Sequence, residues 1–168
     1  MATVYLSIGS NIDREASVRK CLSMLRTEFG VCRWSEVYES APVGFDGDPF
    51  WNLVVAVESE LPLDKLRERL RAIEHACGRE RQACSMSRTM DIDLLLYGDM
   101  VANAVPRDEI ERYAFVLRPL AELAPDVCHP LSGVSMRALW ESFDASREHL
   151  SRVEIELAVA LGAPGHPS

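Results

Sequence analysis

Apolar and polar side chains alternate at the start of the chain, where Val4, Leu6 and Ile8 occupy every second position. A period of two is that of a β-strand with one buried face, so residues 3–8 are predicted to be extended. Apolar runs bounded by turn residues predict three more extended segments, over residues 31–38, 52–58 and 89–97.

Between these segments the apolar positions recur every three to four residues, which is the spacing of one helix face. A first helix is expected between Asp13, a residue type that caps helix N-termini, and Gly30. A second helix begins at Pro62 and stops near Gly78. Later helical patterns cover residues 112–123, 139–143 and 146–161.

The order of these elements is strand, helix, strand, strand, helix, strand and then helical material. It predicts an α/β (α+β) fold of the ferredoxin-like sandwich type, with an antiparallel or mixed sheet and extra C-terminal helices. The length of 168 residues is that of one domain. We expect this domain to span residues 1–161, with an added C-terminal helix at about 146–161 and a disordered tail over 162–168.

The charge of the chain excludes some functions. The chain carries 18 Lys and Arg against 26 Asp and Glu, a formal net charge of −8, which disfavours nucleic-acid binding through phosphate neutralisation. No stretch of the sequence approaches the roughly 18 to 20 uncharged residues that cross a bilayer, so no membrane span is expected. Residues 61–90 differ from the rest, because seven basic and four acidic residues give this stretch +3, which would attract a small anion.

Five cysteines are an odd number without close pairing. This pattern argues against a disulfide framework and for a reducing compartment. The N-terminus has no basic segment followed by a long apolar run and a cleavage site, so no export signal is expected. The expected location is the cytoplasm.

Asp91 and Asp93 lie two residues apart on a predicted strand, so both carboxylates project from one face, roughly 6.6 Å apart along it. Mg²⁺ takes such paired carboxylates together with water and substrate phosphates. Ile92 and Leu94 mark the strand as buried, where ionised carboxylates are unfavourable unless paired or metal-bound. A salt-bridged or solvent-facing pair is the alternative, and the pattern leaves it open.

Arg79, Arg81 and Arg88 lie in a segment without periodicity just before that strand. Guanidinium groups bind phosphate oxygens bidentately, so arginines facing two metal-binding aspartates would hold a polyphosphate. A solvated basic loop is the alternative. The chain lacks the glycine fingerprints of dinucleotide and P-loop sites, and no histidine has an evident nucleophile partner.

Phe50 and Trp51 end a segment, 40–51, whose prolines, glycines and aspartates exclude regular structure. Asn52 follows them with an amide donor and a carbonyl acceptor, and Phe115 lies beside a later irregular segment. Aromatic rings with a nearby amide can enclose and bind a planar heterocycle. Core packing is the alternative, and it is favoured more for Trp51 than for Phe50.

Six segments between about residue 3 and residue 130 resemble, in unchanged order, the 6-hydroxymethyl-7,8-dihydropterin pyrophosphokinase family of folate biosynthesis. They are residues 5–11, 42–44, 50–57, 73–81, 88–94 and 115–125. The most specific is the segment that contains Arg88, Asp91 and Asp93. The resemblance implies transfer of the β,γ-pyrophosphoryl group of ATP to the hydroxymethyl oxygen of the pterin, leaving AMP.

The resemblance also implies the cofactors and the site residues. ATP would be the co-substrate, with two Mg²⁺ ions bound by Asp91 and Asp93. The pterin would lie between Phe50 and Phe115, and its edge would be bound by Asn52 and by groups near Ser40 and Val43. The implied catalytic residues are Arg79, Arg81, Arg88, Asp91 and Asp93, and the implied ATP-binding residues are Arg71, Glu74, Arg79, Arg88, Arg107 and Arg112.

Three features depart from the family pattern. Residues 84–87 stand where the family usually has a run containing tryptophan. Arg107 follows Pro106 where a histidine is usual. Tyr113 stands where the family has an arginine, and Arg112 is displaced by one position. These departures concern the ATP side more than the pterin side.

Two alternatives to the enzyme therefore stay open. One is a pterin-binding relative with reduced or different phosphoryl transfer. The other is a non-catalytic ferredoxin-like interaction module, in which the predicted C-terminal helix would present an apolar face to a second copy. That face consists of Leu150, Val153, Leu157 and Leu161. We expect small-molecule partners, pterin and ATP, and a monomer or weak homodimer.

Overall fold

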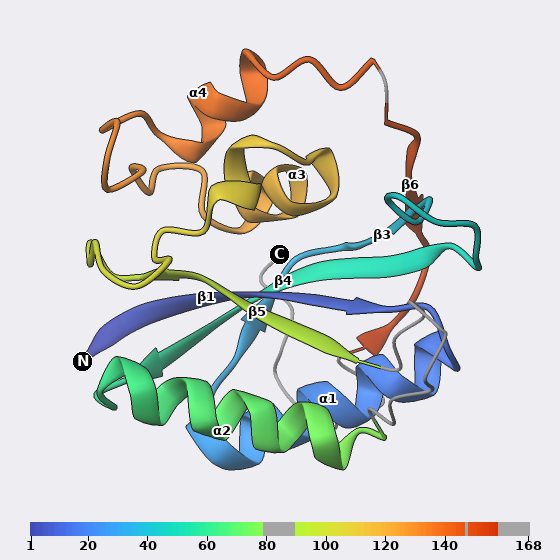
Figure 1. The fold of residues 1–168 in the computed structure, drawn as a ribbon, viewed down its shortest axis with the longest axis horizontal. Helices are drawn as coiled ribbons and strands as arrows, with labels where there is room; N and C mark the ends of the chain where they lie inside the picture. Colours follow the sequence, from blue (N-terminus) through green and yellow to red (C-terminus); the bar gives the residue numbers. More distant parts are fainter. Residues whose placement is uncertain (79–89, 147, 158–168) are drawn as a thin grey trace.

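The chain forms a six-stranded sheet with helices on both faces (Figure 1). The structure is a computed structural model that describes residues 1–78, 90–146 and 148–157. Its strands are β1 (Ala2–Ser10), β2 (Arg33–Trp34), β3 (Val37–Ser40), β4 (Phe50–Ser59), β5 (Asp91–Tyr97) and β6 (Leu150–Val153). Its helices are α1 (Arg14–Phe29), α2 (Leu63–Ala76), α3 (Ala114–Leu123) and α4 (Met136–Glu141), with a 3-10 turn η1 (Asp108–Glu111).

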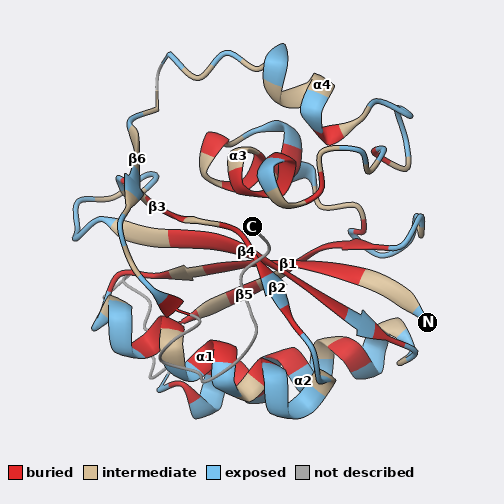
Figure 2. Ribbon diagram, turned by 180° about the vertical axis from the view of Figure 1, so that it is seen from behind, coloured by how far each residue is buried: buried red, intermediate tan, exposed pale blue. Residues whose placement is uncertain are grey.

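The strands follow the order β5-β1-β4-β3-β6, with β2 also paired to β4 and each of these pairings antiparallel. Helices α1 and α2 cover one face of the sheet, and α3 covers the other, with α4 packed on the far side of α3 (Figure 1). The alternation along β1 supplies both cores: Val4 and Ile8 pack under α1 and α2, and Tyr5 packs under α3. Figure 2 shows the buried residues along the sheet and on the inner sides of the helices. The predicted ferredoxin-like sandwich is confirmed.

The first helix begins where the sequence predicts it, but Asp13 does not cap it with its side chain. Asp13 occupies the N-cap position with φ 46° and makes no side-chain cap hydrogen bond. Its carbonyl oxygen accepts the first hydrogen bond of the helix, from the Ser17 amide at 2.8 Å. Gly30 ends the helix with φ 83°, a left-handed conformation that glycine adopts easily.

The C-terminal region differs from the expectation. The helix predicted over 146–161 is wrong across Leu150–Val153, which form an edge strand paired with β3, with Leu150 opposite Ser40. The three-residue spacing of Leu150 and Val153 suits one helix face, whereas in the strand the two side chains point to opposite faces of the sheet. The unpaired hydrogen-bonding edge of β3 outweighs this local pattern. Leu157 packs into the core under α1 and α2, so the helix face expected to contact a second copy does not form in this part of the chain.

No helix within residues 1–78, 90–146 and 148–157 has the length and the apolar character that crossing a bilayer requires.

Candidate active site

A cavity of about 250 Å³ opens on the sheet face that α3 covers. The strands contribute alternate residues to it, namely Ser7, Gly9, Ser40, Phe50, Asp91 and Asp93. The segments that follow β3 and β5 add Ala41, Val43, Phe45, Glu109 and Phe115. The cavity therefore joins residues from distant parts of the sequence, because β1, β3, β4 and β5 end close together in the sheet.

The paired aspartates lie as their spacing predicts. In the antiparallel pairing of β5 with β1, Asp93 is opposite Ser7 and Asp91 is opposite Gly9. Both carboxylates line the cavity, whereas Ile92 between them is buried in the core on the other face. The expectation that the two side chains share one face of a buried strand is confirmed.

The environment of Asp93 disfavours its charged form. Burial raises the pKa of its carboxyl to about 6, the Arg107 guanidinium opposes this shift, and the neighbouring Asp91 carboxylate adds to it. A buried carboxylate beside a second one gains stability from a nearby cation. Two oxygen-donor side chains with that electrostatic need fit a hard divalent cation, which would complete its coordination with water and phosphate oxygens. Within the described part of the chain, no group of three or more His, Cys, Asp or Glu side chains forms a fuller metal site.

Arg107 lies between two carboxylates at the edge of the cavity. Its Nη2 atom is 3.6 Å from Asp93 Oδ1, and its Nε donates a hydrogen bond to Glu109 Oε1 at 2.8 Å. The Arg107 amide also donates to the Leu95 carbonyl at 3.0 Å, which fixes this segment beside β5. Sequence reasoning missed Glu109. Glu109 lies two residues after Arg107 in a 3-10 turn, and its position in the sequence points to the cavity only when that turn is known.

Three aromatic rings form the opposite side of the cavity. Phe50 and Phe115 both line it, as predicted, and Phe45 joins them. The rings of Phe45 and Phe50 meet edge-on, with centroids 6.3 Å apart, and Phe115 stacks on Tyr113 at 5.0 Å. Phe45 was not predicted as a site residue, although it lies in the segment whose aromatic content suggested a binding surface.

Asn52 lies buried on the cavity face of β4, two residues after Phe50. Its Nδ2 donates hydrogen bonds to Ser40 Oγ at 2.7 Å and to the Tyr38 carbonyl at 3.1 Å. Asn52 thus orients Ser40, which lines the cavity together with the half-exposed Val43. Ser40 and Val43 are cavity-lining residues, and the buried Asn52 lies next to the cavity-lining Gly9.

A second hollow of about 220 Å³ shares Asp91 and Asp93 with the aromatic cavity. Its other polar lining residues are Arg67, Arg71, Glu74 and Arg107. The Oε2 atom of Glu74 accepts a hydrogen bond from the Ile92 amide at 2.7 Å, which fixes α2 against β5. Three of the predicted ATP-binding residues therefore meet here, and Arg67 is an addition that the sequence did not reveal.

Arg112 does not line either of these hollows. It lies over the Tyr113 ring at 5.2 Å and lines a neighbouring cavity of about 400 Å³, which shares Ser40, Val43 and Phe115 with the aromatic cavity. Arg79, Arg81 and Arg88 lie outside the described residues. The three residues thought to face the aspartates from the preceding loop are therefore not placed by the structure.

The 7,8-dihydro-6-hydroxymethylpterin-pyrophosphokinase (HPPK) family matches residues 5–125 of the chain. The chain belongs to this family. The HPPK of Aquifex aeolicus, named 2-amino-4-hydroxy-6-hydroxymethyldihydropteridine pyrophosphokinase, is 35% identical over 137 residues, which cover 78% of this chain and 86% of that protein. The protein of the same name from Haemophilus influenzae is 33% identical over 143 residues, covering 80% and 89%. The resemblance inferred from the sequence is confirmed.

Among solved structures, the wild-type HPPK-DHPS of Plasmodium falciparum is similar with a TM-score of 0.69 and 14% identity. The match covers 92% of this chain and 48% of that one, so the chain spans about half of the solved protein. At this identity the likeness supports the HPPK fold alone.

Proposed function

We propose that this member of the HPPK family transfers pyrophosphate from ATP to the hydroxymethyl group of 6-hydroxymethyl-7,8-dihydropterin in folate biosynthesis. The hydroxymethyl oxygen forms a bond to the β-phosphorus of ATP and gives up its proton. The bond between that phosphorus and the oxygen bridging the α- and β-phosphates breaks, and AMP leaves.

The main observation behind this proposal is that two neighbouring hollows share one pair of carboxylates. Asp91 and Asp93 line both the aromatic cavity and the arginine-lined hollow. A planar substrate in the first and a polyphosphate in the second would meet at these side chains. Holding two reactants in contact is itself a large part of catalysis in phosphoryl transfer.

The aromatic cavity suits a pterin ring. Phe50 and Phe115 offer ring faces, Phe45 closes a third side, and Ser40 with its oriented hydroxyl offers a polar contact for the ring edge. Asn52 then acts on the substrate through Ser40 and through the backbone of the strand pair.

Mg²⁺ is the cation that we propose for the aspartate pair, as two ions. The support is chemical: two oxygen donors on one strand face suit a hard cation that also takes water and phosphate ligands, and such a cation would stabilise the Asp93 carboxylate, whose pKa burial raises. When bound, the metal would neutralise phosphate charge. Asp91 and Asp93 would hold it, and burial of the site would keep water from the reacting phosphorus.

The arginines would bind and orient the phosphates. Arg71 and Arg107 line the second hollow, where Glu74 fixes the position of α2. Arg107 would exchange its carboxylate partners for phosphate oxygens, which bind a guanidinium in the same bidentate way. We extend the proposal to Arg79, Arg81 and Arg88 on the family resemblance, with Arg112 as a more distant contributor.

We also propose a single domain that acts in the cytoplasm as a monomer or weak homodimer. Support for one domain comes from the shared sheet, in which the N-terminal β1 and the C-terminal β6 belong to the same set of strands. The odd number of cysteines supports a reducing compartment.

The decisive experiment is an assay of the nucleotide product. The protein is incubated with ATP, Mg²⁺ and hydroxymethyldihydropterin, and AMP formation is followed by chromatography. We expect AMP in equal amount to pyrophosphorylated pterin, no AMP without pterin, and loss of AMP in Asp91→Ala. Formation of ADP instead, or full activity in Asp91→Ala, would contradict the proposed chemistry.

One observation favours a second candidate, a pterin-binding protein without transfer activity. Arg107 is engaged by Asp93 and Glu109, at the position where phosphate charge would need it. Quenching of pterin fluorescence on binding, with no AMP formed at any ATP concentration, would select this candidate.

A further inference from the structure

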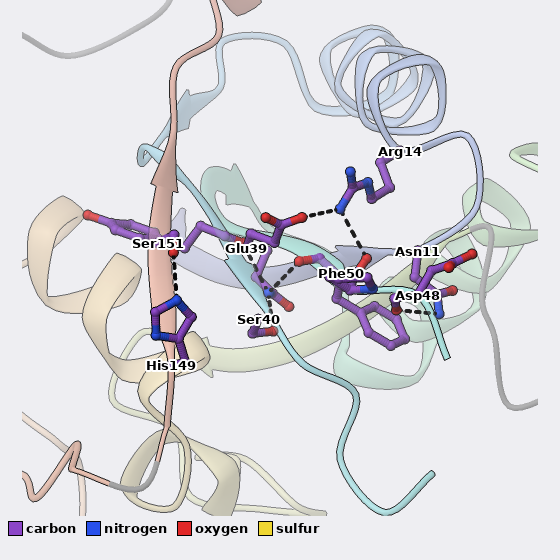
Figure 3. Close-up of polar contacts among 11 residues, drawn as sticks. Asn11, Arg14, Glu39, Ser40, Asp48, Phe50, His149 and Ser151 are labelled. Atoms are coloured by element: carbon purple, nitrogen blue, oxygen red, sulfur yellow. Dashed lines mark hydrogen bonds and ion pairs between the residues drawn. The ribbon is translucent and has the colours of Figure 1, made fainter. Parts of the chain in front are cut away.

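Arg14, the first residue of α1, contacts both strands that flank the pterin side of the cavity. Its Nη1 donates to Glu39 Oε1 at 2.6 Å and to the Pro49 carbonyl at 3.2 Å (Figure 3). Its guanidinium carbon also lies 5.0 Å from the centroid of the Trp51 ring. A charge-assisted hydrogen bond and a cation–π contact from one planar group fix that group in a single orientation.

The strand register shows what these contacts support. In the pairing of β3 with β4, Glu39 is opposite Trp51 and Ser40 is opposite Phe50. Successive residues of a strand point to opposite faces, so Glu39 and Trp51 face α1 while Ser40 and Phe50 face the cavity. Arg14 therefore holds from behind the two strand ends whose front forms the cavity wall.

These two strand ends also bound the segment 41–49, which is irregular and carries Phe45 into the cavity. Glu39 lies just before this segment and Pro49 is its last residue, so Arg14 joins both of its ends. Asn11 adds a parallel contact, because its Nδ2 donates to the Asp48 carbonyl at 3.1 Å (Figure 3). Tying the ends of an irregular segment lowers the entropy that the segment loses when it binds a ligand.

We propose that Arg14 is a positioning residue for the pterin cavity, which sets the 41–49 segment and the Phe50 ring before the substrate arrives. The inference rests on the proposed pterin-binding function. It assigns Arg14 no contact with the substrate and no part in ATP binding. Its loss should therefore weaken pterin binding without changing the nucleotide side.

The test compares Arg14→Met with a control on the same helix, Arg19→Met. The described contacts of Arg19 are an ion pair with Glu15 at 3.1 Å and a hydrogen bond to the Glu156 carbonyl at 3.3 Å. Methionine keeps an unbranched apolar stem like that of arginine and lacks the guanidinium donors. We expect Arg14→Met to raise KM for the pterin about tenfold, the effect of one lost charge-assisted hydrogen bond, with KM for ATP and kcat within about twofold.

Arg14→Lys should recover part of the pterin affinity, because it keeps the charge near Glu39 but cannot make both hydrogen bonds and the ring contact. Equal rises in both KM values, or an unchanged pterin KM, would overturn the proposal. Hydrogen exchange of the amides in 41–48 provides a readout that needs no activity. Faster exchange in Arg14→Met than in Arg19→Met supports the role even if the wild type makes no AMP, and equal exchange refutes it.

Discussion

The two sides of the cavity are stabilised in different ways. On the aromatic side, Phe45, Phe50 and Phe115 are held by ring contacts, and Arg14 secures the strand ends behind them. This side is complete without a ligand. On the other side, the carboxylates of Asp93 and Glu109 flank the Arg107 guanidinium, Asp91 lies beside Asp93, and burial raises the pKa of Asp93 to about 6.

This contrast predicts which properties can be changed separately. An aromatic wall formed by packing should determine how tightly the pterin binds. A carboxylate group that is unfavourable without a cation should determine metal binding and turnover. Substitutions on the two sides should then alter different kinetic constants.

The largest effect is expected from Asp93→Asn. The amide keeps the size of the side chain but binds a divalent cation poorly, so we expect kcat to fall at least about a hundredfold, with pterin affinity nearly unchanged. The measurement is AMP formation together with pterin fluorescence. Asp99→Asn, an exposed position just after β5, is the matched control and should keep full activity. If Asp93→Asn lost pterin binding as well, the two sides would not be independent.

Removing a ring from the aromatic side should give an intermediate effect. Phe45→Ala and Phe50→Ala each lose a ring contact with the pterin and with each other, so we expect KM for the pterin to rise about tenfold. KM for ATP should stay constant. Because the two rings contact each other, the rise in KM for the pterin in the double variant should be smaller than the product of the rises in the two single variants. A rise in KM equal to that product would show that the two rings act independently.

A smaller effect is expected from Arg107→Gln, seen in the pH profile. Arg107 lowers the pKa of Asp93, so removing its charge should move that pKa above 6. The carboxylate would then be protonated at a higher pH, and the acid limb of the Mg²⁺-dependent rate should shift upward by a fraction of a pH unit. If the acid limb lay at the same pH in both proteins, the charge of Arg107 would have no influence on the titration of Asp93.

The smallest effect concerns stability without metal. The native pKa of Asp93, about 6, is above the ordinary value of a free carboxyl near 4, so between these two pH values the folded state binds more protons than the unfolded state. The free energy of unfolding therefore falls as pH rises through this window. Asp93→Asn should raise Tm in EDTA at pH 8, and the gain should vanish by about pH 4. A gain that is independent of pH would point to packing instead of charge.

Local sequence patterns were enough to predict the layers of the fold and the shared strand face of Asp91 and Asp93. The period-two alternation predicted that Val4 and Ile8 face one core, and the same spacing predicted that Asp91 and Asp93 share a strand face. Both could be predicted because successive side chains of a strand point to opposite faces. The family could also be recognised from local motifs.

Features that depend on contacts between distant segments became visible only in the folded chain. Phe45 and Glu109 enter the site from irregular segments whose course no local pattern specifies. Arg112 turns toward Tyr113, away from the hollow that contains Arg71 and Arg107, because side-chain direction in a turn follows the packing around it. Residues 150–153 became a strand because β3 offered them an unpaired edge, and a helix-compatible pattern of four residues is too short to resist that pairing.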